Sequence, residues 1–187
     1  QLDKCSWQVH SEGTQALMAH LVALGHRRIG FIYGVTTQSQ GSDRLAAYQQ
    51  ALEDAGLPND DSLVSWCGER LEDGYQAALD LLRRPDRPTA LLTINDMLGI
   101  AAVRAAVDLG LRVPDDVSIA SFDDIPFASY SVPRLTTVTG SQEQTGRDGV
   151  RLLLKRLAQP DRPREVIEAK WQLMIRESTG PAPEHSG

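Results

Sequence analysis

Two adjacent carboxylates, Asp123 and Asp124, follow directly on the apolar run of residues 117–122. A charged group at the end of a buried strand is costly to withdraw from water unless a partner or a ligand compensates it. Asp123 ends the run and is therefore a candidate ligand contact, whereas Asp124 could instead cap the short turn that follows. A metal site is not indicated, because no third oxygen ligand stands at a recognisable spacing.

Polar side chains follow three other apolar runs, at residues 28–33, 62–67 and 89–94. Amide, guanidinium and carboxylate groups together can hydrogen-bond a neutral ligand that is polyhydroxylated or heterocyclic. The sequence therefore predicts a small-molecule site at these positions. Besides Asp123, the candidate contacts are Gln38, Gln40, Arg44, Glu69 and Asn95.

Each of these residues also has a purely structural interpretation. Asn95 stands where it could cap the helix that begins after it, with or without touching a ligand. Arg44 is spaced to pair with Asp43 or Glu53 on a solvated helix face.

The elements that must position these residues alternate along the first two thirds of the chain. Apolar residues at helical spacing predict helices over residues 11–24, 42–55, 73–82 and 96–109, and the four apolar runs between and after them read as strands. Strands that are separated by single helices run parallel with right-handed crossovers, which gives a doubly wound α/β layer. Such sheets bind ligands beyond the carboxyl ends of their strands, where the polar candidates stand.

The regular alternation of helices and strands ends after residue 131. The stretch at 134–138 reads as a short strand, and the helix expected over 141–157 carries the apolar residues Val150, Leu153, Leu154 and Leu157 on one face. Apolar and polar residues then alternate over 167–176, which is typical of a strand with one buried and one solvent-exposed face. The tail, residues 179–187, has the composition of a disordered segment.

Composition narrows the function classes. The 187 residues carry a net charge of −6, which argues against a nucleic-acid-binding surface, and no apolar run approaches the length of a membrane span. Cys5 and Cys67 make neither a disulfide framework nor a metal site, so we interpret them as free thiols of a reducing compartment. The four histidines lack ligand spacing, and no nucleotide loop or nucleophile elbow is present. We expect no enzyme activity, no metal and no cofactor.

Four ordered blocks resemble the effector-binding region of the LacI/GalR family of bacterial transcription repressors. They are LVALGHRRIGFIYG, SDRLAAYQQALEDAGLP, RPTALLTINDMLGIAAVRAAVDLGLRVPDDVSIASFDD and PRLTTVTGSQEQTGRDGVRLLLKRL. Together they cover roughly residues 11–180 in order.

The resemblance implies an organisation in parts. Members of the family have a DNA-binding headpiece and a core like that of type I periplasmic binding proteins, with the effector between two subdomains. The chain starts at Gln1, and we expect it to be a piece of a longer protein that lacks the headpiece and the first half of the core. The expected parts are a lead-in at 1–10, the C-terminal subdomain at 11–131, a strand and helix of the absent N-terminal subdomain at 132–160, a return strand at 161–178 and the disordered tail at 179–187.

The resemblance also implies effector contacts by Arg44, Asn95 and Asp123, with further contacts near Gln38 and Gln40. Many members have GDF or GDW after the second strand of this subdomain, which supplies an aromatic ring that stacks on the ligand. The corresponding segment of this chain is WCGERLEDGY, so Glu69 or Arg70 occupies the position of that aromatic residue. The family dimerises through surfaces such as the helix that starts at Asn95 and the loop after Asp123.

The resulting expectation is a non-enzymatic sensing module of a cytoplasmic LacI-type repressor. It would bind a sugar or related metabolite, form a homodimer, touch operator DNA only through the absent headpiece, and have no membrane partner. The alternative is a fragment of a periplasmic sugar-binding protein of a transporter, which shares the fold. Unpaired cysteines and the regulator-like blocks argue against that alternative.

Overall fold

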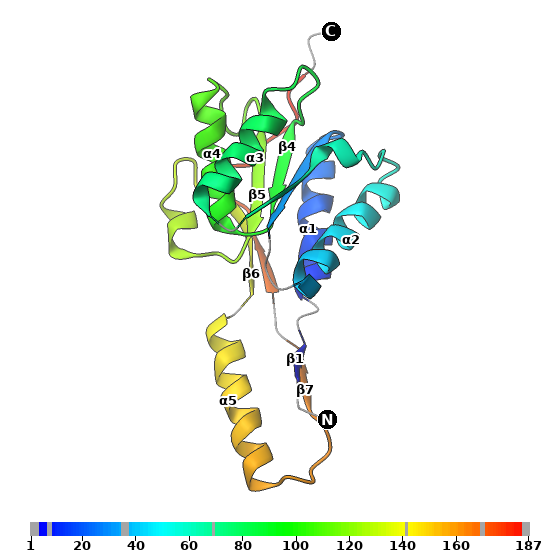
Figure 1. The fold of residues 1–187 in the computed structure, drawn as a ribbon, viewed down its shortest axis with the longest axis vertical. Coiled ribbons are helices and arrows are strands. Elements are labelled where there is room, and N and C mark those ends of the chain that lie inside the picture. Colours follow the sequence, from blue (N-terminus) through cyan, green and yellow to red (C-terminus); the bar gives the residue numbers. More distant parts are fainter. Residues whose placement is uncertain are drawn as a thin grey trace.

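The computed structural model describes residues 4–6, 9–34, 38–68, 70–140, 142–168 and 171–184. Its main body is a six-stranded sheet with helices on both faces (Figure 1). The strands lie in the order β3-β2-β4-β5-β6-β8, in which all neighbours are parallel except β6 and β8. Their bounds are β2 Ile29–Gly34, β3 Val64–Cys67, β4 Ala90–Thr93, β5 Ser118–Phe122, β6 Thr136–Gly140 and β8 Trp171–Met174.

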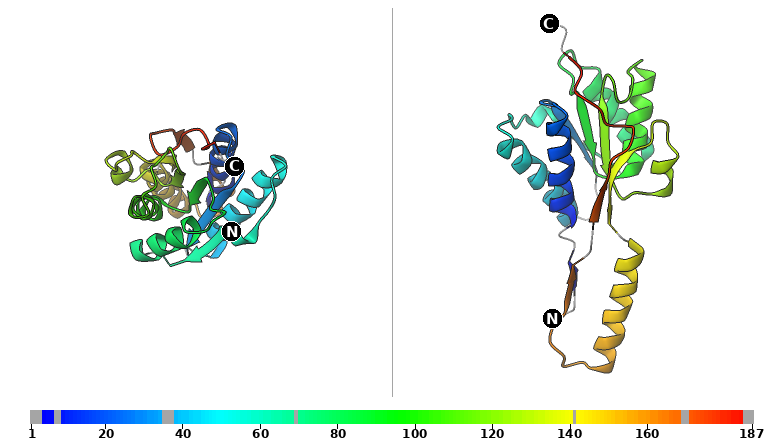
Figure 2. Two further views of the ribbon diagram at one scale, coloured as in Figure 1. Left: turned by 90° about the horizontal axis from the view of Figure 1, so that it is seen from above. Right: turned by 180° about the vertical axis from the view of Figure 1, so that it is seen from behind.

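Two pairs of helices cover the sheet, which confirms the predicted doubly wound α/β fold. The α1 and α2 helices lie on one face, and α3 and α4 on the other (Figures 1 and 2). Strand β4 is buried along its whole length because its side chains alternate between the two layers: Leu91 packs under α3 and α4, and Leu92 under α1 and α2. The helices are α1 Val9–Ala23, α2 Gln38–Asp54, α3 Leu71–Leu82 and α4 Asp96–Asp108.

Strand β6 differs from the expected assignment of residues 132–160 to another subdomain. It lies inside the main sheet, parallel to β5 and antiparallel to β8. Its Val138 is buried beside Phe122 in the layer under α1 and α2. The strand therefore completes the sheet that carries the candidate site.

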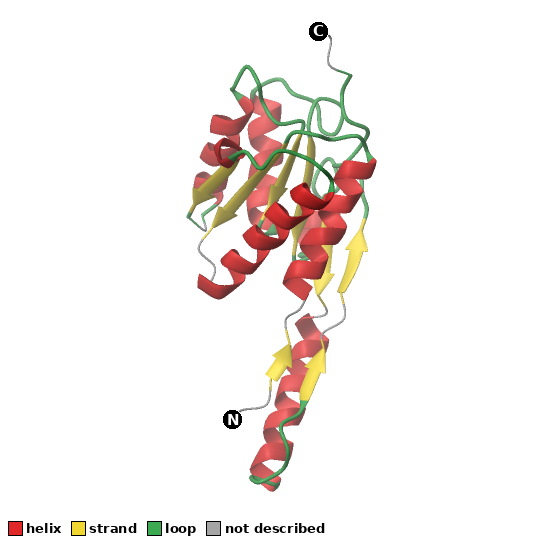
Figure 3. Cartoon of the chain, turned by 90° about the vertical axis from the view of Figure 1, so that its right-hand side faces the viewer, coloured by secondary structure: helices red, strands yellow, loops and turns green. Residues whose placement is uncertain are grey.

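The expected return strand at 161–178 is divided between two sheets. Strand β7 (Val166–Glu168) pairs in parallel with β1 (Lys4–Ser6), and β8 pairs with β6 in the main sheet. The β1–β7 pair and α5 (Gln142–Ala158) extend away from the body, as Figures 1 and 3 show.

Helix α5 exposes the apolar face that the sequence predicts. Leu152 is buried, whereas the four residues of the predicted stripe are each more than half exposed. An apolar face of this kind ordinarily has a partner. Its members are Val150, Leu153, Leu154 and Leu157.

The tail differs from the expected disorder, because residues 178–184 follow a defined path. The Ser178 hydroxyl accepts a hydrogen bond from the Thr136 amide at 2.8 Å and donates to the Ile119 carbonyl. The buried His26 ring lies 3.1 Å from the Gly180 carbonyl oxygen, so this histidine has the structural role of fixing the tail. Polar composition suggested disorder, but these small polar residues satisfy buried backbone and ring groups.

Candidate ligand-binding site

The carboxyl ends of β2, β3, β4 and β5 lie along one edge of the sheet, called here the carboxyl edge. Because β6 runs parallel to β5 and leads into α5, this edge faces the end of the body from which α5 extends (Figure 1). Of the predicted contacts, the structure brings Arg44, Asn95 and Asp123 to the carboxyl edge, from α2, from the end of β4 and from the end of β5. Gln38 and Gln40 lie in the first turn of α2, where only the backbone is described, and Glu69 lies outside the described residues.

Arg44 is buried, with 6% of its surface exposed, so it does not lie on a solvated helix face. Its guanidinium carbon lies 4.3 Å from the centroid of the Phe122 ring, and its Nη1 donates to the carbonyl oxygen of Ile94. Arg44 thereby bridges the ends of β4 and β5. Burial lowers the pKa of Arg44, and the charge of Asp123 acts in the opposite direction.

Asp123 is half-buried and begins the turn after β5. Burial raises the pKa of its carboxyl group, while the nearby charge of Arg44 lowers it. Its backbone φ is 107°, and Asp124 follows with a φ of 51°. Left-handed backbone at two consecutive residues other than glycine is strained, and such strain is held where surrounding contacts enforce it.

Asn95 caps α4, as its position in the sequence suggested. Its Oδ1 accepts a hydrogen bond from the Leu98 amide at 2.9 Å, and its backbone is extended. Capping uses the oxygen of the side-chain amide, so a ligand contact would use its Nδ2 group.

Asp124 does not cap the turn that follows it. The cap residue of the short helix η2 (Pro126–Ser129) is Ile125, without a side-chain cap. Asp124 pairs instead with Arg176 at 2.6 Å, and both side chains are mostly buried. This ion pair ties the turn after β5 to the chain beyond β8.

Asp96 is the residue that sequence reasoning missed. Its side chain is fully buried and accepts hydrogen bonds from the hydroxyls of Ser121 and Thr137 and from the Ile125 amide. Burial is the largest influence on its pKa and raises it to about 6. The position after Asn95 in the sequence indicated only the first turn of a helix, because the donors are supplied by β5, β6 and the turn between them.

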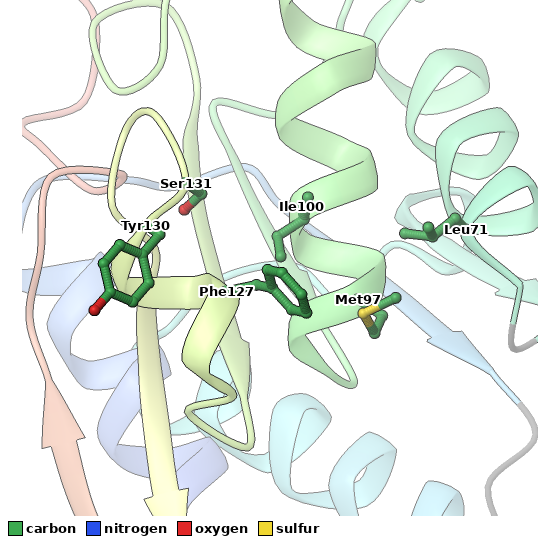
Figure 4. Close-up of a pocket in the computed structure, with 6 residues that line it drawn as sticks. All are labelled: Leu71, Met97, Ile100, Phe127, Tyr130 and Ser131. Atoms are coloured by element: carbon green, nitrogen blue, oxygen red, sulfur yellow. The ribbon is translucent and has the colours of Figure 1, made fainter.

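A second feature is an apolar groove of about 310 Å³ between α4 and η2 (Figure 4). Phe127 and Tyr130, which both line this groove, are 68% and 83% exposed, which is unusual for aromatic side chains. The groove is lined by Leu71, Met97, Ile100, Phe127, Tyr130 and Ser131.

Comparison with known proteins agrees with this geometry. The chain matches the periplasmic binding protein-like domain family over residues 18–179. The repressor PurR of Mannheimia succiniciproducens is 34% identical over 167 residues, which are 89% of this chain and 50% of that protein. PurR of Escherichia coli is 33% identical over 172 residues, 92% of this chain and 50% of the relative. The chain thus spans about half the length of these curated relatives.

Solved structures give the same result. The complex of the transcriptional regulator CelR with cellobiose has a TM-score of 0.84 and 33% identity, and the match covers 90% of this chain and 52% of that one. A putative LacI regulator from Bacillus cereus subsp. cytotoxis has a TM-score of 0.88 at 26% identity, with 92% and 61% covered. A LacI-family regulator from Enterococcus faecium with bound ribose has a TM-score of 0.83 at 26% identity, with 92% and 63% covered.

A doubly wound sheet with polar groups at its carboxyl edge is an arrangement that binds small ligands, and the family match over residues 18–179 identifies it as a periplasmic binding protein-like domain. The chain belongs to this family and, within it, to the effector-binding regions of LacI/GalR-type regulators. Within the part of the chain that the structure describes, no helix combines the length and apolar character needed to cross a membrane.

Proposed function

We propose that this chain is the effector-sensing part of a cytoplasmic transcriptional repressor and that its carboxyl edge contacts a neutral, hydroxyl-rich small molecule. The observation that carries this proposal is the placement of Arg44 and Asp123 from two different elements at one edge of the sheet. A buried guanidinium and a half-buried carboxylate form strong, directional hydrogen bonds to hydroxyl groups. Asn95, at the end of β4, adds an amide at the same edge.

The relatives support a regulator rather than a transporter component. Those named above are transcriptional regulators, not enzymes, and two related structures hold sugars, cellobiose in one and ribose in the other. Contact with operator DNA belongs to a part of the protein outside this chain, and the acidic composition agrees with that.

We also propose that the apolar groove is the homodimer surface. Met97 and Ile100 lie on one turn of α4, Phe127 lies in η2, and Tyr130 directly follows η2. These positions match the helix and the loop through which, by resemblance, the LacI/GalR family dimerises. Effector binding at the carboxyl edge would then act on the dimer through α4 and the turn after β5, both of which contribute to the groove.

Nuclear magnetic resonance titration of this chain tests the effector site. The probes are cellobiose, ribose and adenine, the last as a neutral heterocycle. We expect millimolar dissociation constants, which correspond to about −4 kcal/mol, because Arg44 and Asp123 occupy only one side of a ligand. The signals to follow are the Arg44 Nε–H, the Asn95 Nδ2 amide and the Asp123 amide, with the exposed Arg104 Nε–H as internal reference.

Asp123→Ala should weaken the responding probe at least about tenfold, since it removes a charged acceptor. The matched control is Asp80→Ala, at an exposed site on α3. Shifts that map to the apolar groove instead of the carboxyl edge would contradict the site, and so would an absence of shifts with all three probes at tens of millimolar.

A further inference from the structure

The carboxylate of Asp96 connects four parts of the fold. It stands at the first residue of α4 and is fully buried. Its Oδ1 accepts from Thr137 in β6 at 2.7 Å and from Ser121 in β5, and its Oδ2 accepts from the Ile125 amide at 2.8 Å. One side chain therefore holds α4, β5, β6 and the start of η2 together.

Two of these donors lie on either side of the strained turn. Ser121 precedes Asp123 by two residues and Ile125 follows it by two, so the carboxylate of Asp96 fixes both ends of a five-residue segment. Thr137 adds a third link, because its hydroxyl also accepts from the Asp124 amide at 3.4 Å. The left-handed backbone of Asp123 persists under these contacts.

Stability alone is a poor explanation for this carboxylate. The donors that reach it from the described residues are two hydroxyls and one amide, and none of them carries a charge. A buried carboxylate without a cation is costly even when hydrogen-bonded, and the positive end of α4 offsets only part of that cost. The turn that it holds carries Asp123 on one side and leads into Phe127 on the other.

We propose that Asp96 is a positioning residue whose carboxylate holds Asp123 in place at the carboxyl edge and links that position to η2 and the apolar groove. The proposal rests on the proposed function, in which Asp123 contacts the effector. Ligand contact at Asp123 and packing of Phe127 then depend on the same short segment.

Protonation of Asp96 can be used to test whether its carboxylate holds the turn after β5. The charged groups on the surrounding elements are Asp123, whose charge also raises the pKa of Asp96, Arg44 beside Asp123, and the pair of Asp124 with Arg176. The pKa of Asp96 is about 6, so its carboxyl group is ionised near pH 7 and largely protonated near pH 5. A protonated carboxyl group is a weaker acceptor for the Ile125 amide, which loosens the turn.

Amide hydrogen exchange on this chain tests the link without a ligand. After correction for intrinsic rates, we expect the amides of residues 123–125 and 127–130 to exchange at least about tenfold faster near pH 5 than near pH 7, with a midpoint near pH 6. Asp96→Asn keeps an acceptor and a donor at the same place but cannot titrate, so its exchange should lose this transition. Asp80→Asn, on the surface of α3, is the matched control and should retain it.

Thr137→Val provides a second, isosteric variant. The Thr137 hydroxyl lowers the pKa of Asp96, so its removal should move the midpoint of the exchange transition to higher pH. A purely structural residue would change the unfolding temperature without moving this midpoint. If Asp96→Asn does not fold, an unmoved midpoint in Thr137→Val overturns the proposal.

The remaining outcomes are also decisive. Wild-type exchange that is flat between pH 5 and pH 7, or a transition that persists in Asp96→Asn, overturns the positioning role. Cellobiose titrations at the two pH values form a separate arm, in which we expect roughly tenfold weaker binding at the lower pH. If neither cellobiose nor the other two probes give shifts at either pH, the proposed effector site fails, while the exchange result still decides the role of Asp96.

Discussion

Replacing Phe127 by serine should weaken self-association strongly while leaving the stability of the single chain almost unchanged. Phe127 is 68% exposed, and an aromatic side chain offers about 200 Å², so about 140 Å² is available for burial against a partner. At about 25 cal/mol per Å² this corresponds to at most about 3.5 kcal/mol per copy. A two-fold interface uses the same patch twice, so the maximum is about 7 kcal/mol per dimer.

Imperfect burial reduces this figure. If only half of the exposed ring area is buried against the partner, Phe127→Ser costs about 3.5 kcal/mol per dimer, which raises the dissociation constant roughly 300-fold. The free energy of unfolding should change by less than about 0.5 kcal/mol, because the side chain is already largely exposed in the single chain.

The assay is sedimentation equilibrium over a range of concentrations, with urea unfolding of the same samples. All variants carry Leu153→Lys and Leu157→Lys, so that the exposed face of α5 does not drive association by itself. Trp66→Ser is the matched control, since Trp66 is 64% exposed but lies on the edge strand β3, away from the groove.

Three results would refute the reasoning. The background protein could be monomeric at all concentrations, which removes the dimer. Phe127→Ser and Trp66→Ser could weaken association equally, which removes the specificity of the groove. Phe127→Ser could also lower the free energy of unfolding by more than about 1 kcal/mol, which would assign Phe127 to internal packing.

Three further predictions concern the fold and the site. Ser178→Ala should lower the free energy of unfolding by about 2–4 kcal/mol, measured in urea, because two buried backbone groups lose their partner. Arg44→Met should raise the pKa of Asp123, followed by carbon NMR of its carboxyl group, because Arg44 is the group that lowers it. Since the folded pKa of Asp123 lies above its ordinary value, its ionisation costs stability as the pH rises, and Arg44→Met should steepen that loss. In α5, Leu152→Ala should cost about 2–4 kcal/mol in the same unfolding assay, and Leu153→Ala less than about 0.5, because only Leu152 is buried.

The alternation of helices and strands could be predicted because burial leaves a periodic trace in the sequence. Strand β4 is buried at every position and apolar at three of its four, since both of its faces are covered, and the helices show one apolar stripe each. Gly25 and Gly110, with φ of 93° and 75°, stand where the first and fourth helices were expected to end. These signals are local, so one sequence suffices to read them.

The placement of β6 and of the tail could not be predicted in the same way. Thr136 and Thr137 are buried, although threonine pairs carry no clear signal of burial. They are buried because their hydroxyls meet partners from distant parts of the chain, Thr179 for one and Asp96 for the other. Contacts between residues about 40 positions apart leave no periodic trace.

The two adjacent carboxylates after β5 differ in their partners, and tertiary contacts determine that difference. In the sequence Asp123 and Asp124 differ by one position, yet Asp124 pairs with Arg176 and Asp123 lies near Arg44. Spacing along the chain could not predict which carboxylate has which partner, because Arg176 is 52 residues from Asp124.

The charges around the turn after β5 also bear on the class of effector. Among the described residues, three carboxylates and two guanidinium groups meet there: those of Asp96, Asp123 and Asp124, and those of Arg44 and Arg176. Asp124 and Arg176 neutralise each other, and Arg44 offsets Asp123, which leaves the buried Asp96 uncompensated. An anionic ligand would add a second negative charge to a region of low polarity, at a cost that only a further cation could offset. A neutral ligand with several hydroxyl groups avoids that cost, since it can donate to Asp123 and accept from Arg44 at the same time.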